Sequence, residues 1–196
     1  MDNTKFTDRQ IEIMEAAAFR IDQNGIQELT IKNLAADLRL SEAALYRHFK
    51  SKNDIMLGLL SYFILEMKER LAKIISKNSS PTIQLKEIFD SQLKTFAKKP
   101  SIVSIVFSEG IFQFNKELSD MVSKMMELMQ THINSIVKKG QEEGIFRELI
   151  GSDTISTIII GSMRITVLKW KLSGHKSNLI KEGNSVLKGL LKMIEK

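Results

Sequence analysis

Apolar residues recur every three or four positions along almost all of this 196-residue chain, and only two prolines interrupt the pattern. This period places apolar side chains on one face of an α-helix. The alternation with a period of two that is typical of strands is hardly seen. The sequence therefore predicts an all-α fold.

Helix limits can be predicted from capping residues and breaks. Thr7 and Gln10 form the pattern of a capping box, and Gly25 is placed to stop the helix that follows. Pro81 suits the first position of a later helix. Beyond residue 80 the predicted helices are 82–98, 102–109, 115–139, 153–173 and 177–194.

Two very short helices are predicted between the first helix and a fourth one, which runs from about Ser51 to about Lys77. Thr30 is a predicted cap for helix 31–37, and Ser41 for helix 42–48. Helices of this length are marginal alone and need packing against longer neighbours. The spacing of the pair suits a helix-turn-helix, whose second helix can enter the major groove of DNA.

The second short helix has a face that a core does not need. At 100° per residue, Leu45 and Phe49 point inward together, while Ala43 and Arg47 point the opposite way. Small side chains allow close approach to base edges, and an arginine can reach guanine or phosphate. The sequence therefore predicts a nucleic-acid face. It is flanked by Ala44 and Tyr46, and side chains that could donate to phosphate follow it: His48, Lys50 and Lys52.

The same stretch carries a family resemblance. Thr30, Leu34-Ala35, Leu40-Ser41 and then Leu45-Tyr46-x-His48-Phe49-x-x-Lys52 resemble the N-terminal signature of TetR-type transcriptional regulators. The likeness covers about residues 6–58, and the rest of the chain is similar only in length and helical layout. It implies a three-helix helix-turn-helix DNA-binding domain, expected at 1–52, joined to a helical effector-binding and dimerisation domain, expected at 53–196.

The resemblance also implies roles for individual residues. It implies phosphate contacts for Thr30, Tyr46, His48 and Lys52, to which the position of Lys50 adds a further expected contact, and it implies that bases are read by Lys32, Glu42, Ala43, Ala44 and Arg47. Each also has a plainer interpretation. Tyr46 could pack on the turn, His48 could cap a helix, the lysines could be ordinary surface residues, and Glu42 could favour the helix N-terminus.

One position departs from the family pattern. Arg39 stands in the turn where glycine is usual. If the backbone is left-handed there, arginine costs about 1 kcal/mol relative to glycine. We expect the turn to survive, with Arg39 offering an additional phosphate contact.

The C-terminal region is rich in soft apolar side chains that suit a pocket for an apolar ligand. The predicted effector pocket consists of Phe89, Phe96, Phe107, Phe112, Met121, Met125, Met129 and Arg164. Core filling would explain the same phenylalanines and methionines. Arg164, expected to be partly buried, needs a partner, either a ligand carboxylate or a structural acid such as Glu109.

The last two helices carry wide apolar stripes, which favour an isologous four-helix interface between two copies of the chain. The residues predicted at this interface are Ile155, Ile158, Ile159, Ser162, Ile180, Leu187 and Leu191. Tight packing within one chain would leave the same pattern.

Composition bears on the partners and the cellular location of the protein. The net charge of +6 lies in residues 164–196, which hold eight Lys and Arg against two Glu, and so reflects a solvated lysine face rather than the DNA-binding stretch. The chain has no cysteine, no signal-peptide pattern and no run long enough to span a bilayer, so we expect a cytoplasmic protein without a membrane partner. No metal-binding or cofactor-binding pattern is present.

Three functions are compared. The leading hypothesis is a homodimeric regulator, most simply a repressor, that a small effector of unknown identity releases from a near-palindromic double-stranded DNA operator. The alternative is a DNA-anchored protein that recruits a protein partner without an effector, because Ser41 to Phe49 is similar to the same segment of a family member associated with nucleoid occlusion. An enzyme is disfavoured, since only His48, His132 and His175 exist and no catalytic motif accompanies them.

Overall fold

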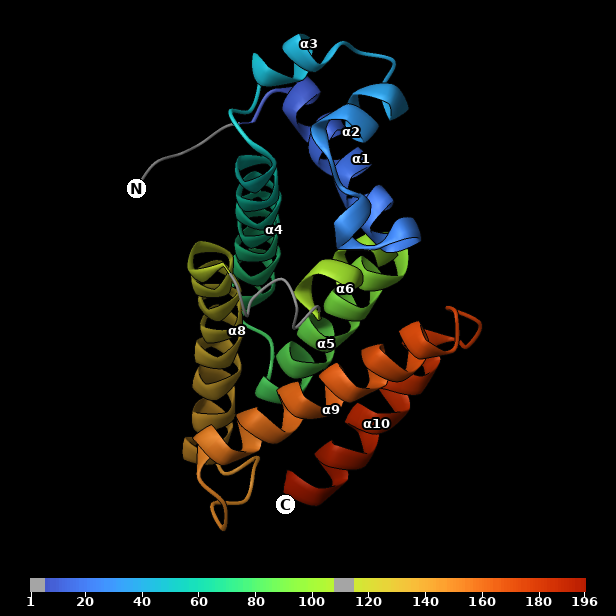
Figure 1. The fold of residues 1–196 in the computed structure, drawn as a ribbon. Coiled ribbons are helices and arrows are strands. Elements are labelled where there is room, and N and C mark those ends of the chain that lie inside the picture. The colour runs from blue at the N-terminus through green and yellow to red at the C-terminus, as the bar shows by residue number, and fades with distance from the viewer. Residues whose placement is uncertain (1–5, 108–114) are drawn as a thin grey trace. The chain divides into compact units, whose positions relative to one another are not determined.

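The structure, a computed structural model, describes residues 6–107 and 115–196. Within these ranges the chain forms α-helices, one short 3-10 helix (η1, Ile26–Glu28) and a single isolated β-bridge between Phe146 and Glu195 (Figure 1). The predicted all-α fold is confirmed. Each α-helix begins and ends within three residues of its predicted limits. Among the described residues, no helix has both the length and the apolar character needed to cross a bilayer.

The described chain divides into two compact units. Unit 1 comprises residues 1–66 and 101–123, and unit 2 comprises residues 67–100 and 124–196. Two of the three divisions fall within long helices, α4 (Lys52–Ile75) and α8 (Lys116–Glu142), so each of these contributes residues to both units. The third follows Pro100. The expected domain boundary after residue 52 falls at the start of α4 and remains a prediction.

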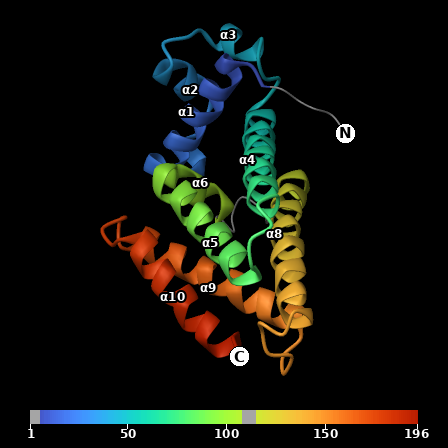
Figure 2. The same cartoon turned by 180° about the vertical axis from the view of Figure 1, so that it is seen from behind.

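Unit 1 contains the four predicted N-terminal helices. They are α1 (Asp8–Asn24), α2 (Ile31–Asp37), α3 (Glu42–Tyr46) and the first part of α4, joined by α6 (Pro100–Val106) and the start of α8. Figure 2 shows α1, α2 and α3 from behind. The side chains of Ile13, Met14, Leu34 and Leu45 are almost completely buried, because each lies on the apolar face of its helix.

The predicted caps of these helices are confirmed. The hydroxyl of Thr7 accepts a hydrogen bond from the N–H of Gln10, and the Gln10 side chain accepts one from the N–H of Thr7, which completes the capping box. Thr30 caps α2 at 3.1 Å and Ser41 caps α3 at 3.2 Å. Side-chain caps thus set the start of α1, α2 and α3.

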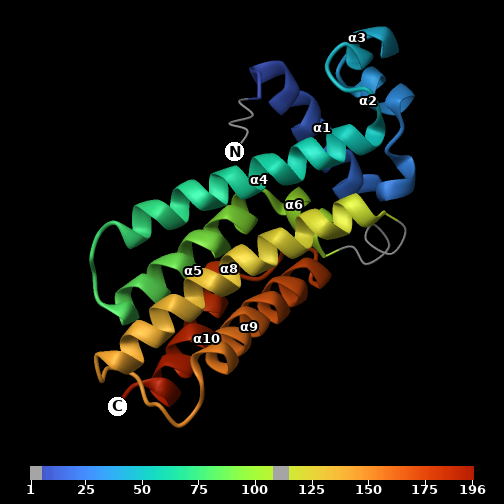
Figure 3. The same cartoon turned by 90° about the vertical axis from the view of Figure 1, so that its left-hand side faces the viewer.

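Unit 2 is built from α5 (Pro81–Lys98), α9 (Ser152–Leu172), α10 (Leu179–Ile194) and the remainders of α4 and α8. α10 packs against both α5 and α9. Figure 3 shows these helices from the side. Gly183 allows the contact with α5, since a Cβ there would lie 2.3 Å from Cδ1 of Leu93. Gly140 likewise leaves room for the buried ring of Phe146, since a Cβ there would lie 2.2 Å from Cδ2 of Phe146.

Candidate nucleic-acid interface

The turn between α2 and α3 contains an arginine in the left-handed region. Arg39 has φ of 55°. Its N–H donates to the carbonyl oxygen of Ala36 at 3.2 Å, and the N–H of Leu40 donates to that of Ala35 at 2.9 Å. These are the two hydrogen bonds of a Schellman motif, with Arg39 at the position where glycine is most common. The left-handed backbone considered for this turn is therefore present, and the exposed Arg39 side chain lies shortly before α3.

α3 has only five residues, so tertiary packing must fix it. Leu45 and Phe49 are buried and form its inner side, as predicted. The helix ends at Tyr46 rather than at residue 48, but the N–H groups of His48 and Phe49 still donate to the carbonyl oxygen of Leu45 at 2.9 and 3.1 Å. These two hydrogen bonds form a compact turn that joins α3 to α4.

Gly58 of α4 makes room for this packing. A Cβ at Gly58 would lie 3.0 Å from Sδ of Met14 and 3.1 Å from Cε1 of Phe49. The amide of Gln10 also reaches the carbonyl oxygen of His48 at 3.5 Å, the outer limit of a hydrogen bond. Gly58 was not among the residues predicted to be important. Its signal was a glycine inside a helical pattern, which has a packing reason when it is not a cap.

The outward side of α3 carries most of the residues expected to read bases. Glu42, Ala43 and Arg47 are exposed, and Tyr46 is 51% exposed. Ala44, in contrast, is 8% exposed and packs inward beside Leu45. The buried side of α3 therefore includes Ala44 as well as Leu45. The helical period alone does not predict this, because tertiary contacts decide which side of a short helix is buried. The expected pair of outward alanines is reduced to Ala43.

The residues expected to contact phosphate lie around α3 on neighbouring segments. Thr30, Lys50 and Lys52 are exposed and His48 is half-buried. The Thr30 hydroxyl accepts the capping bond from Asn33 and keeps its own hydrogen for a donor role. Lys52 is the first residue of α4, where the exposed N–H groups of a helix N-terminus also favour an anion.

The cations of this surface are not neutralised by the protein. Within residues 6–107 and 115–196, the side chains of Lys32, Arg47, Lys50 and Lys52 make no ion pair and no hydrogen bond. Charged side chains without protein partners remain free to bind phosphate or base edges.

A different arginine in unit 1 is fully engaged. Nε and Nη2 of Arg20 on α1 lie 2.5 and 2.6 Å from the two carboxylate oxygens of Asp37 on α2. The hydrogen bond to Asp37 raises the pKa of Arg20, and the hydrogen bond from Arg20 lowers the pKa of Asp37. This bidentate pair fixes α1 to the end of α2, just before the turn.

Further hydrogen bonds within unit 1 connect the DNA-binding helices to α6 and α8. The hydroxyl of Ser104 in α6 donates to Asp22 of α1 at 2.5 Å. Asn53 of α4 accepts from Asn115 at 2.5 Å and donates to Glu117 of α8 at 2.9 Å. No local pattern points to these pairs, since each joins residues more than 60 positions apart.

The residues of the expected effector pocket are distributed over both units. Phe89, Phe96 and Met129 are buried in unit 2, where Met125 is half-buried and Arg164 is exposed rather than partly buried. Phe107 and Met121, both half-buried, belong to unit 1, and Phe112 lies outside the described residues. A pocket shared by these side chains therefore stays a prediction.

The residues expected at a dimer interface fall on two sides of their helices. Buried inside unit 2 are Ile155, Ile159, Leu187 and Leu191. Ser162 and Ile180 are half-buried, and Ile158 is 45% exposed. The wide stripes predicted for α9 and α10 are thus largely used within one chain, because α10 packs against both α5 and α9.

Comparison with known proteins agrees with this architecture. Residues 13–59 match the family described as bacterial regulatory proteins, tetR family, and residues 59–195 match the TetR C-terminal family described as YsiA-like protein, C-terminal region. The second match alone spans more than half of the chain.

Individual relatives are similar along nearly the whole length. The nucleoid occlusion factor SlmA of Alteromonas mediterranea is 26% identical over 176 residues, which cover 89% of this chain and 87% of that protein. The ketosteroid transcriptional regulator KstR2 of Mycobacterium tuberculosis superposes with a TM-score of 0.82 at 22% identity, covering 98% and 97% of the two chains. The transcriptional regulator FadR of Bacillus subtilis, solved in complex with stearoyl-CoA, superposes with a TM-score of 0.80 at 23% identity, covering 92% and 97%. The protein therefore belongs to the TetR family of bacterial DNA-binding transcriptional regulators.

Proposed function

We propose that this regulator is a homodimeric repressor that binds a near-palindromic operator and is released from it by a small, largely apolar ligand. The observation that carries the DNA-binding part is the exposed side of α3, on which Ala43 and Arg47 lie beside Tyr46. Arg47 can form a bidentate contact with guanine, while the methyl of Ala43 suits a thymine methyl. A regulator of this kind acts where the bacterial chromosome lies, in the cytoplasm.

A second copy of the chain is proposed to dock on the outer side of α9 and α10. The exposed apolar and glycine positions of this side form what we term the α9–α10 stripe: Ile158, Gly161, Ile165 and Leu172 of α9, with Val186, Gly189 and Met193 of α10. They recur at intervals of three, four and seven and so share one side of each helix. A methyl group built on Gly161 or Gly189 would meet no atom of the chain within 4 Å, which leaves room for a partner helix to approach closely.

Dimerisation supplies the geometry that an operator requires. Two reading helices must enter successive major grooves whose centres are about 34–36 Å apart. The pairs Asp22–Ser104 and Asn53–Asn115 join α1 and α4 to α6 and α8 within unit 1. We propose that a ligand which displaces α6 or the start of α8 changes the orientation of α1 and α4 through these pairs, and so weakens operator binding.

The apolar character of the effector is supported by the side chains and by the relatives. Phe89, Phe96 and Met129 are buried apolar side chains of unit 2, and a methionine can adapt its shape to an apolar ligand. FadR of Bacillus subtilis was solved with stearoyl-CoA, and KstR2 is described as a ketosteroid regulator. We therefore propose an effector with a long apolar part.

The alternative, a DNA-anchored protein that recruits a protein partner, is favoured by the similarity to SlmA. It is also favoured by the connection between α8 and α9, where Leu149 is 88% exposed and Ile150 is 46% exposed. The amide of Gln141 holds this connection by donating to the carbonyl oxygens of Arg147 and Ile150 at 2.9 and 2.8 Å. Catalysis is set aside because the family consists of regulators.

One experiment separates the two proposals. Genomic fragments that the protein retains at moderate salt are sequenced, and the bound operator is then titrated with stearoyl-CoA and with a steroid. Release of a near-palindromic fragment by either compound supports the ligand-responsive repressor. Retention of specific fragments that neither compound affects favours partner recruitment, and retention of all fragments alike contradicts both.

A further inference from the structure

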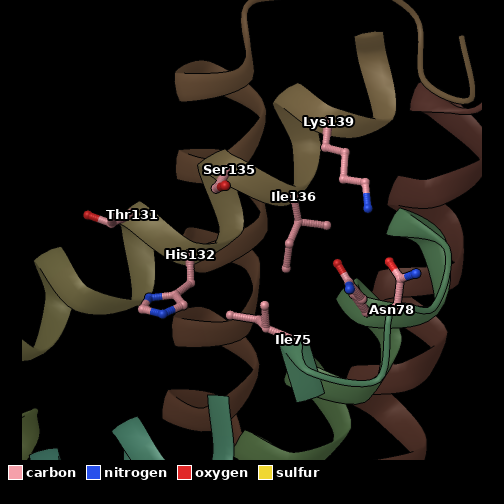
Figure 4. Close-up of a pocket in the computed structure, with 8 residues that line it drawn as sticks. Ile75, Asn78, Thr131, His132, Ser135, Ile136 and Lys139 are labelled. Atoms are coloured by element: carbon pink, nitrogen blue, oxygen red, sulfur yellow. The ribbon is translucent and has the colours of Figure 1, made fainter. Parts of the chain in front are cut away.

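Unit 2 contains a pocket that does not include any residue of the expected effector pocket. Its volume is about 460 Å³, and it is lined by residues of α8, the end of α4, the α4–α5 connection and α5: Ile75, Asn78, Gln84, Thr131, His132, Ser135, Ile136 and Lys139 (Figure 4). This volume lies in the range that binds small molecules. Figure 4 shows His132, Ile136 and Lys139 extending from α8 toward the side on which Ile75 and Asn78 lie.

The most informative lining residue is Gln84. Its side chain is only 4% exposed, yet its amide makes no hydrogen bond to any described residue. The polar atoms of this amide are not among the fully buried, unpaired ones, so they still face the opening of the pocket. The amide can therefore donate to and accept from a ligand bound there.

The charge of the lining is one-sided. Lys139 provides a permanent positive charge, and no aspartate or glutamate lines the pocket. Lys139 forms an ion pair with Glu143, in which Nζ lies 3.7 Å from Oε1, beyond hydrogen-bonding distance. Both side chains are more than 40% exposed, so this ion pair is weak. The ammonium group is therefore available to an anion.

The other polar groups of the lining can donate to the same anion. The amides of Asn78 and Gln84 and the hydroxyls of Thr131 and Ser135 are all possible donors. Nδ1 of His132 lies 2.8 Å from the carbonyl oxygen of Leu128 and so carries a proton, which fixes the ring. The backbone of Asn78 is held in the left-handed region, with φ of 49°, directly after α4.

The groove between α5 and α10 gives a contrast. It has a similar volume of about 470 Å³, but its lining includes two carboxylates, Glu87 and Asp90. Asp90 accepts from Lys94 at 2.6 Å and from Asn184 at 3.2 Å. The pocket at Gln84 differs from this groove because its lining contains a lysine and no carboxylate.

We propose that the pocket at Gln84 and Lys139 binds a small aliphatic monocarboxylate. One fixed cation matches a single negative charge better than the nearly double charge of a phosphate monoester. The carboxylate would accept from Lys139 and the Gln84 amide, and the aliphatic part would lie against Ile75 and Ile136. The inference does not depend on the proposed repressor function, since the site lies wholly within unit 2 and its occupancy is measured without DNA.

The test uses the full chain and hexanoate as the probe. Isothermal titration calorimetry is carried out with sodium hexanoate, butyl phosphate and hexan-1-ol at one ionic strength. We expect saturable binding of hexanoate, weaker binding of butyl phosphate and no detectable binding of hexanol at the same concentration. Butyl phosphate binding more tightly than hexanoate, hexanol binding equally well, or the absence of saturable hexanoate binding would overturn the proposal.

Variants locate the binding. Lys139→Met and Gln84→Leu are each expected to weaken hexanoate at least about tenfold, since each removes one hydrogen bond to a charged group. Lys138→Met, which removes the adjacent exposed lysine outside the pocket, should leave the affinity unchanged. Equal losses in Lys138→Met and Lys139→Met would overturn the site. Circular dichroism checks folding, and Lys139→Met decides the outcome if Gln84→Leu does not fold.

Discussion

At the scale of single residues, two kinds of DNA contact are expected around α3. Some specify the base sequence, and others bind phosphate and only position the protein. Arg47 is exposed and has no described protein partner, and it lies beside Ala43 on the outward side. Tyr46 and Lys52 lie at the edges, where phosphates are expected. Removing Arg47 should therefore change operator affinity by an amount that depends on the sequence, whereas removing Tyr46 and Lys52 should change it equally for all sequences.

Arg47→Ala should lower affinity for the preferred operator by about 1–3 kcal/mol and relax preference at particular base pairs. Tyr46→Phe combined with Lys52→Ala should weaken binding to all sequences alike and reduce the salt slope by about 1 per lost phosphate contact. Fluorescence anisotropy against a panel of operator variants at several salt concentrations measures both. Lys68→Ala, an exposed lysine elsewhere on α4, is the control. An equal loss on every sequence for Arg47→Ala would show that Arg47 contacts only the backbone.

Arg39 offers a second residue-scale prediction. Because its φ is 55°, Arg39→Gly should raise the free energy of unfolding by about 1 kcal/mol. Arg39→Ala keeps the strained backbone and should change stability little. Urea denaturation measures both. If Arg39 also contacts phosphate, the two variants should lose operator affinity equally, and unequal losses would contradict that role.

At the scale of elements, the short helices depend on their clamps. The hydrogen bond from Arg20 lowers the pKa of Asp37, so the charged carboxylate stabilises the folded state. This stabilisation is present above the ordinary carboxyl pKa of about 3.9 and is lost as the pH falls through the lower folded-state value. The joint between α1 and α2 is thus weakest in acid.

Asp37→Asn should therefore lower the Tm at neutral pH, and the difference from the unmodified protein should shrink as the pH falls below about 4. Asp120→Asn, an exposed aspartate on α8 without an ion-pair partner among the described residues, serves as the control. Differential scanning calorimetry between pH 3 and pH 7 measures the effect. A deficit that is the same at every pH would contradict the ion pair as its cause.

Much of the element structure could be predicted from local chemistry. The caps at Thr7, Thr30 and Ser41 follow from residue type and spacing, and all three are present. The left-handed backbone at Arg39 is suggested only by the glycine that the family usually carries at this position. The inward rotation of Ala44 could not be predicted in this way, because it depends on which neighbours α3 meets. The hydrogen bonds that join α6 and α8 to α1 and α4 connect distant residues and leave no periodic signal.

At the scale of the whole molecule, function depends on a partner copy. The helical period identified α9 and α10 as broad apolar helices, but it could not say which side the chain itself would cover. Ile155 and Leu187 are buried within unit 2, whereas Ile165 and Met193 are exposed at 51% and 71%. The proposed interface is therefore on the opposite side of these helices from several predicted residues.

Ile165→Glu should convert the dimer to a monomer and weaken operator binding at least about a hundredfold, since each half-site then binds alone. Leu149→Glu alters a more exposed leucine outside the α9–α10 stripe and should affect neither property. Sedimentation velocity gives the oligomeric state, and anisotropy gives the affinity. A dimer that persists in Ile165→Glu would place the interface elsewhere.

The most direct test of the DNA-reading account is selection of duplexes from a random pool at moderate salt, followed by footprinting of the winner. The proposed role of α3 predicts a near-palindromic site with two protected half-sites one helical turn, or a multiple of it, apart. It further predicts that Arg47→Ala selects a less defined sequence from the same pool. A pool that stays random after repeated selection would contradict the assignment of α3 as the reading helix.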